Sequence, residues 1–126
     1  MQEKKYFSVE EANECIPELI SDITLLLKLK EELEKLHAKL TPFLEVIPTN
    51  GGSKDALKLM QIGEEFRRIV ESIQERGCYL KGLEPALIDF PHLRDGKEVY
   101  LCWRYGEREI RYWHEIHDGF TGRKPL

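Results

Sequence analysis

The sequence predicts an α+β fold, in which a long helical segment precedes a small antiparallel sheet. In the first part of the chain, apolar side chains recur every three or four residues, the spacing of one helix face. After Gly77 the period changes to two, and aromatic and β-branched residues stand between turn signals. Because 126 residues suffice for one modest core, we expect a single domain over residues 1–126, helical in 1–77 and β-stranded in 78–126.

The helical part opens with a capping box, Ser8 followed by Glu11, in which each side chain takes a backbone N–H of the other residue. Pro17 lacks an N–H and clashes with the preceding turn, so we expect a short N-terminal helix and then a long one. The apolar seam of these helices has the spacing of a coiled coil and comprises Ile16, Leu19, Ile23, Leu26, Leu29, Leu33, Leu36, Leu40, Phe43 and Ile47.

A turn-forming segment, residues 48–53, interrupts the helical pattern. A second amphipathic stretch then runs to Gly77, with the apolar residues Leu59, Ile62, Phe66, Ile69 and Ile73. The two helices are therefore expected to fold back as a long antiparallel hairpin. A seam of this length also suits pairing with a second copy, so the hairpin is a candidate surface for homo-oligomerisation.

Two turn signals divide the β part. Asp95-Gly96 suits a type I′ turn, and Gly106-Glu107 suits a type II′ turn with glycine first. They predict strands at about 87–93, 97–104 and 108–114 in a sheet of three to four antiparallel strands, with the C-terminal tail closing over one edge.

Two-residue loops in both hairpins would determine which side chains share a face of the sheet. Asp89 would then lie beside Cys102, and Cys102 beside Arg111, while His92 and His114 would lie on the opposite, apolar face. In this register Asp89 and Arg111 form an ion pair. A catalytic pair of Cys102 and His114 would require a bulge or an odd-length loop.

Composition excludes several classes of partner. A net charge of −4 argues against a nucleic-acid surface, which needs concentrated lysine and arginine. No stretch of the chain is apolar enough for a signal core or a membrane span. The three cysteines, Cys15, Cys78 and Cys102, lack paired spacing and suit reduced thiols. We therefore expect a cytoplasmic protein with no membrane and no nucleic-acid partner.

Potential metal ligands are densest near the C-terminus, where His114, Glu115, His117 and Asp118 fall within five residues. Imidazole together with carboxylate suits a divalent zinc, iron or manganese ion. The alternative is that His114 is a core histidine and that the other three form a polar strand end. For Cys102, a small buried packing residue is the simpler interpretation beside a nucleophilic thiol.

A series of short motifs in the β part resembles the prokaryotic family known as domain of unknown function 2203. The residues that carry the resemblance are Gly82-Leu83, Asp89-Phe90-Pro91, Arg94-Asp95-Gly96, Leu101-Cys102-Trp103, Gly106-Glu107, Trp113-His114-Glu115 and Gly119-Phe120-Thr121-Gly122-Arg123, and the opening residues 7–13 are also similar. The resemblance spans nearly the whole chain. It implies that the motif-bearing residues are Asp89, Cys102, Trp103, His114, Glu115, Gly119 and Arg123, but it implies no reaction.

Two classes of function follow. The first is a metal- or small-molecule-binding site in the C-terminal motif, with His114 and Glu115 as metal ligands and with further ligand-binding residues Asp89, Cys102, Trp103 and Arg123. The second is a non-enzymatic module in which the helical hairpin oligomerises or binds a protein partner. The sequence does not decide between an enzyme and a binding protein. A ligand site predicts a pocket with convergent polar groups around His114.

Overall fold

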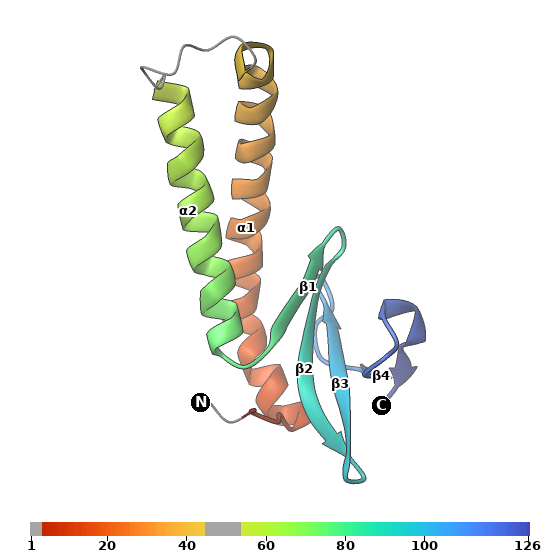
Figure 1. Cartoon of the computed structure of the whole chain (residues 1–126). Helices are drawn as coiled ribbons and strands as arrows, with labels where there is room; N and C mark the ends of the chain where they lie inside the picture. Colours follow the sequence, from red (N-terminus) through yellow and green to blue (C-terminus); the bar gives the residue numbers. More distant parts are fainter. Residues whose placement is uncertain (1–3, 45–53) are drawn as a thin grey trace.

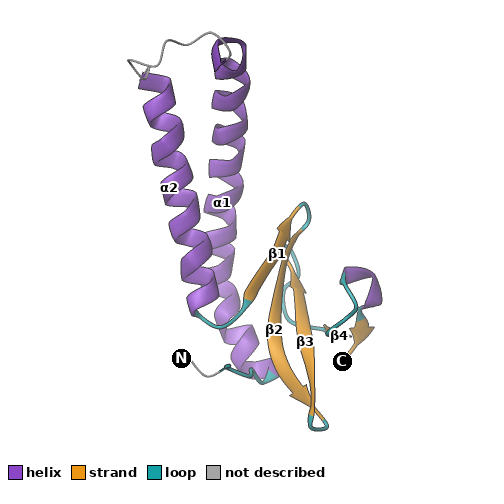
Figure 2. Ribbon diagram, viewed as in Figure 1, coloured by secondary structure: helices purple, strands orange, loops and turns teal. Residues whose placement is uncertain are grey.

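The fold is α+β, as the sequence predicts (Figures 1 and 2). The structure is a computed structural model and describes residues 4–44 and 54–126; the predicted turn at 48–53 and the seam residue Ile47 lie outside them. Its elements, in chain order, are α1 (Val9–Leu44), α2 (Lys54–Glu75), β1 (Tyr79–Leu83), β2 (Ala86–Arg94), β3 (Lys97–Arg104), β4 (Tyr112–Glu115), the 3-10 turn η1 (Phe120–Gly122) and β5 (Lys124–Pro125).

The capping box at the start of α1 is present. The Glu11 N–H donates to Ser8 Oγ and the Ser8 N–H to Glu11 Oε1, each at 3.0 Å. The expected break at Pro17 is wrong, because α1 is one helix from Val9 to Leu44. Pro17 is exposed, whereas Ile16 and Leu19 on either side of it are buried. Burial of that helix face outweighs the one backbone hydrogen bond that the proline removes.

The two helices lie side by side and run in opposite directions (Figure 1). An ion pair joins Lys39 and Asp55 at 2.7 Å near one end, and Arg76 pairs with Glu18 at 2.9 Å and with Asp22 at 3.2 Å near the other. The end that holds Lys39 and Asp55 extends well beyond the sheet (Figure 2). Within the described residues, neither helix combines the length and the apolar character needed to cross a membrane.

The sheet has five antiparallel strands in the order β1-β2-β3-β4-β5, one more than the upper limit of the prediction. The helices cover one of its faces, where they bury a core that includes Leu19, Ile73, Phe90, Leu101 and Trp103. The first predicted turn is confirmed, since Asp95 and Gly96 both have positive φ, 52° and 79°. So is the register of β2 and β3, in which Asp89 faces Cys102.

The predicted register of the second hairpin is wrong by one residue. Tyr100 pairs with His114, and Cys102 pairs with Tyr112 in place of Arg111. A shift of one residue moves every side chain of a strand to the other face. His114 therefore lies on the same face as Asp89 and Cys102, and Arg111 pairs with Glu109 in place of Asp89.

The cause of the shift is a longer connection between β3 and β4. A turn closes where the Glu107 N–H donates to the Arg104 carbonyl at 2.9 Å, with Gly106 at φ 108°. Ile110 is then buried in the core, and its N–H donates to Asn13 Oδ1 of α1 at 2.7 Å. Contact with the helix thus draws the chain away from β3, and β4 begins only at Tyr112.

Candidate functional site

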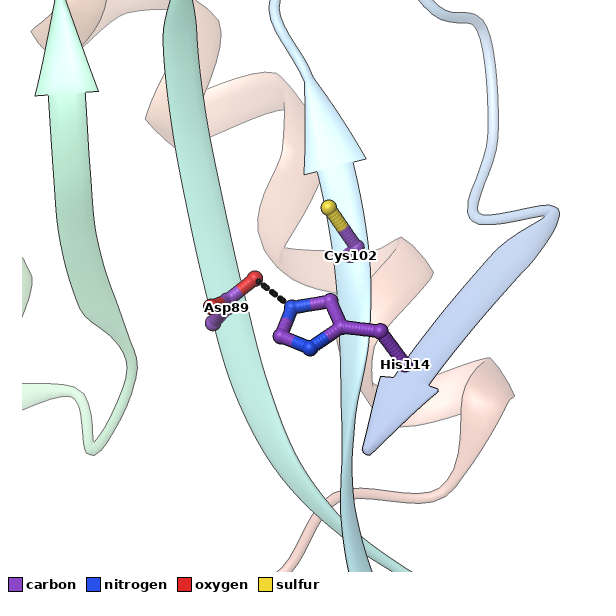
Figure 3. Close-up of side chains that lie close together, drawn as sticks. All are labelled: Asp89, Cys102 and His114. Atoms are coloured by element: carbon purple, nitrogen blue, oxygen red, sulfur yellow. Dashed lines mark hydrogen bonds and ion pairs between the residues drawn. The ribbon is translucent and has the colours of Figure 1, made fainter. Parts of the chain in front are cut away.

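Three polar side chains meet on the sheet face that the helices leave open (Figure 3). Asp89 comes from β2, Cys102 from β3 and His114 from β4. They are 4%, 1% and 3% exposed. Among the described residues, they form a group in which one potential ligand atom of each lies within 4.8 Å of the others. Such burial of three ionisable groups demands a partner for each charge.

Strand pairing explains why these residues converge. Asp89 and Cys102 are direct partners across β2 and β3. His114 pairs with Tyr100, two residues before Cys102 on β3, so its ring reaches the other two side chains along a diagonal. Tyr100 packs against the His114 ring, with ring centroids 5.6 Å apart. Strand pairing therefore positions the His114 backbone, and the Tyr100 ring packs against the imidazole.

The hydrogen bonds of His114 engage both of its ring nitrogens. Nδ1 lies 2.8 Å from the backbone carbonyl of Glu115, which can only accept, so Nδ1 is the donor. Nε2 lies 3.1 Å from Asp89 Oδ1, the contact drawn as a dashed line in Figure 3. Both nitrogens are thus engaged, and neither acts as a base toward the Cys102 thiol. The arrangement is not that of a cysteine–histidine nucleophile.

Electrostatics also keep Cys102 unreactive in the metal-free protein. Burial, and next the negative charge of Asp89, raise the pKa of the Cys102 thiol to about 12, although Arg123 acts in the opposite direction. The thiol is therefore protonated at neutral pH and is a poor nucleophile. A divalent cation reverses this balance, because a coordinated thiol loses its proton.

The donor set fits a transition-metal ion. A tetrahedral zinc ion, with bonds of about 2.0 Å to nitrogen and oxygen and about 2.3 Å to sulfur, holds its ligand atoms roughly 3.3–3.6 Å apart. The separation of 3.1 Å between His114 Nε2 and Asp89 Oδ1 is close to that value. The Nδ1 bond to the Glu115 carbonyl orients the ring as the outer contacts of metal-bound histidines do. A thiolate favours zinc or iron over manganese.

A cavity of about 400 Å³ opens beside the three side chains. The C-terminal tail forms one wall through residues 116–120, and the sheet supplies Lys81, Leu87 and Tyr100. Ligand pockets in proteins typically measure about 300–1,000 Å³, so this one suits a small molecule. The expected pocket with convergent polar groups around His114 is thus present.

The structure brings together only some of the residues that the sequence singles out. Asp89, Cys102 and His114 meet, and Arg123 lies next to them, donating to the Cys102 carbonyl at 3.1 Å. Trp103 and Glu115 do not join this group. Trp103 is buried on the helix side, where its indole N–H donates to the Glu107 carbonyl at 3.0 Å.

Glu115 contributes its backbone carbonyl and not its carboxylate. The side chain pairs instead with Lys97 at 2.7 Å, and this contact lowers the pKa of the Glu115 carboxyl group. Neighbouring residues of a strand point to opposite faces, so His114 and Glu115 cannot both reach the group. His92 does not belong to the group of Asp89, Cys102 and His114 either, because its Nδ1 lies 2.6 Å from the Phe7 carbonyl.

Sequence reasoning missed the residues that shape the cavity. Lys81 belongs to β1, a strand that the sequence-based prediction did not include, and Tyr100 had no assigned role. The alternation of Tyr79 and Lys81 after Gly77 was the one available signal, because residues two apart on a strand share a face.

Comparison with known proteins identifies the family of the chain but no function. No curated protein and no solved structure matches it. The model of one family, described as an uncharacterized conserved protein, matches residues 5–126. The chain therefore belongs to the DUF2203 family over essentially its whole length.

Proposed function

We propose that the protein binds one divalent transition-metal ion, zinc by preference, through Asp89, Cys102 and His114. The observation that carries the proposal is the convergence of three buried donor atoms within 4.8 Å of one another, from three neighbouring strands. A rigid sheet holds all three, so little conformational entropy is lost when a metal binds.

The chemistry of such a site follows from its ligand count. Three protein ligands leave a fourth position open, as in catalytic zinc sites, whereas structural sites are closed by four. The cavity is lined by the same three residues, so a molecule bound in it would have access to the ion. An ion held by Asp89, Cys102 and His114 would supply activation of a water molecule or polarisation of a carbonyl group, which suits metal-assisted hydrolysis or addition.

Metal analysis of protein purified without chelators tests the proposal. We expect about one equivalent of zinc per chain, and its loss in Cys102→Ala and in His114→Ala. Cys78→Ala is the matched control, because Cys78 is equally buried but belongs to the helix-facing core. Substitution with Co²⁺ adds a direct readout, since a thiolate ligand gives charge-transfer absorption that Cys102→Ala abolishes and Cys78→Ala keeps. Absence of stoichiometric metal in the wild-type protein refutes the proposal.

A further variant decides between this ligand set and the one that the sequence suggested. Glu115→Gln removes the carboxylate but keeps the backbone carbonyl that orients His114. We expect it to retain the metal. Loss of the metal in Glu115→Gln together with its retention in Asp89→Asn would contradict the assignment of Asp89.

The redox state of the chain also matters for this site. Cys15, Cys78 and Cys102 are all free thiols. We propose a cytoplasmic location on this ground, because a reducing compartment keeps Cys102 available as a ligand.

A second candidate function is self-association through a helical hairpin. On α2, Leu57 and Met60 are 56% and 72% exposed and are neighbours on one helix face. The helices project beyond the sheet in this region, and no other helix or strand of residues 4–44 and 54–126 lies against them there (Figure 2). The proposed occupant is a second copy of the chain. Sedimentation is expected to show a dimer that Met60→Glu dissociates and the neighbouring exposed-site control Gln61→Glu does not, whereas a monomeric wild-type protein excludes it.

A further inference from the structure

We propose that the cavity beside Asp89, Cys102 and His114 binds a small organic carboxylate with an apolar body, whose acid group takes the open position of the metal. This inference rests on the metal site proposed above and names the class of molecule that it serves.

The charge of the metal centre sets the first requirement. A divalent ion with Asp89 and a Cys102 thiolate is neutral overall, since His114 coordinates as neutral imidazole. Arg123, the nearest cation to Cys102, is already paired with Glu107 at 2.5 Å. An anionic ligand therefore adds one negative charge to the cavity, and it needs a cation that is not already neutralised.

Lys81 meets this requirement. It lines the cavity, and its Nζ lies 5.3 Å from the ring centroids of both Tyr79 and Tyr100. The two rings pack edge to face, with centroids 6.1 Å apart. They hold the ammonium group in place without cancelling its charge. In the described part of the chain, Lys81 forms no ion pair with a carboxylate.

The remaining walls describe the rest of the ligand. Leu87 on the sheet and Ile116 and Phe120 on the tail give the cavity apolar surfaces. Such surfaces favour contact with the hydrocarbon part of an organic acid, whereas they do not stabilise a fully hydrated inorganic ion. Asp118 in the tail wall carries a negative charge, so the carboxylate is placed toward Lys81 and the metal.

The Co²⁺-loaded protein provides a spectroscopic test, because its visible bands change when an anion replaces the metal-bound water. We expect benzoate to shift these bands with saturation, and the neutral isostere benzamide to leave them unchanged. Inorganic phosphate should bind more weakly than benzoate, since it lacks an apolar body. Lys81→Met should weaken benzoate binding by about fivefold, the upper range for an ion pair of an exposed lysine. Lys58→Met, an exposed position on α2, is the matched control.

The outcomes separate the two proposals. Metal binding with no spectral response to benzoate overturns the carboxylate inference and leaves the metal site standing. A response to phosphate but not to benzoate overturns the organic class, and equal effects of Lys81→Met and Lys58→Met overturn the role of Lys81. Failure to bind Co²⁺ or zinc at all overturns both.

Discussion

The Nε2 atom of His114 lies 3.1 Å from Oδ1 of Asp89, and both side chains are nearly inaccessible to solvent. The other ring nitrogen is bound to the Glu115 carbonyl, so Nε2 is the only one that a metal can use. Metal binding as proposed would replace this hydrogen bond by coordination of the ion through Nε2 and Oδ1. In the metal-free protein, the same pair satisfies two buried polar groups.

Asp89→Asn is predicted to separate the structural role of this pair from metal binding. Asparagine keeps a hydrogen-bonding partner for Nε2, because its side chain offers both an N–H donor and a carbonyl acceptor. The free energy of unfolding should therefore fall by less than about 1 kcal/mol in chelator-treated protein. Zinc affinity should fall at least about tenfold, because a neutral amide replaces an anionic ligand. Urea unfolding and competition with a zinc chelator measure the two quantities.

His114→Ala is the contrasting variant for this prediction. It leaves the buried Asp89 carboxylate without its imidazole partner and should cost roughly 3 kcal/mol of stability. Equal stability of the two variants, or unchanged zinc affinity in Asp89→Asn, contradicts the paired arrangement.

Zinc affinity is predicted to increase with pH between pH 6 and 8. Burial and the charge of Asp89 raise the pKa of the Cys102 thiol to about 12, so coordination must release its proton throughout this range. Release of the thiol proton alone contributes a rise of about tenfold in apparent affinity per pH unit. Chelator competition at several pH values measures the slope. A flat profile between pH 7 and 8 would show that Cys102 does not coordinate the ion as a thiolate.

The stability of the metal-free protein is predicted to fall above pH 9. Burial raises the pKa of both Cys78 and Cys102 from 9.0 to about 12. A folded-state pKa above the unfolded value contributes stability that is complete below pH 9 and is lost as the pH rises toward 12. The loss at pH 10 is about 1 kcal/mol for each thiol. Urea unfolding at pH 8 and 10 should show that Cys102→Ala loses only about half as much stability as the wild-type protein, because it retains one of the two buried thiols.

Asn13→Ala is predicted to loosen the site from a distance. The Asn13 side chain on α1 accepts the N–H of the buried Ile110, which sets where β4 begins. Its removal leaves a buried donor unpaired and should cost about 1–2 kcal/mol. Zinc affinity should fall as well, because His114 lies on β4 and a shift of that strand would move its ring away from Asp89 and Cys102. Asn13→Asp keeps an acceptor oxygen and should retain the metal; equal zinc loss in both variants would contradict this mechanism.

Gly122→Ala is predicted to disturb the tail wall of the cavity. A Cβ at Gly122 would lie 2.6 Å from Asp118 Cβ, so η1 must shift. Benzoate binding to the Co²⁺-loaded protein should weaken, while the Co²⁺ content stays unchanged because the three ligands lie on the sheet. Gly63→Ala on α2, away from the cavity, is the control, since a Cβ there meets nothing within 4 Å. Equal responses of the two variants would show that this contact is irrelevant to the cavity.

Several elements of the fold were accessible from local sequence. Ser8 and Glu11 predict the start of α1, because a capping box involves only residues three apart. Asp95 and Gly96 predict the β2–β3 turn, and a two-residue loop then determines that Asp89 pairs with Cys102. The motifs also singled out Asp89, Cys102 and His114 as candidate residues, and the structure brings these three side chains together. The predicted register had placed His114 on the other face of the sheet.

Other features could not be read from local patterns. Pro17 predicts a break when the local chain alone is considered, but burial of Ile16 and Leu19 keeps α1 continuous. Strand β1 was missed because its five residues contain Gly82 and a bulge between Leu80 and Gly82, which interrupts the alternation. The continuity of α1 at Pro17 and the pairing of β1 both depend on contacts with parts of the chain that are distant in sequence.

By itself, the sequence determined the α+β class, the β2–β3 hairpin and the face shared by Asp89 and Cys102, because each depends on local periodicity or on a short turn. Only the tertiary structure decided that His114 joins them. The contact of Ile110 with Asn13 links residues 97 positions apart and lengthens the connection to β4. A shift of one residue then turns the His114 ring from the core to the open face, since the side-chain period of a strand is two.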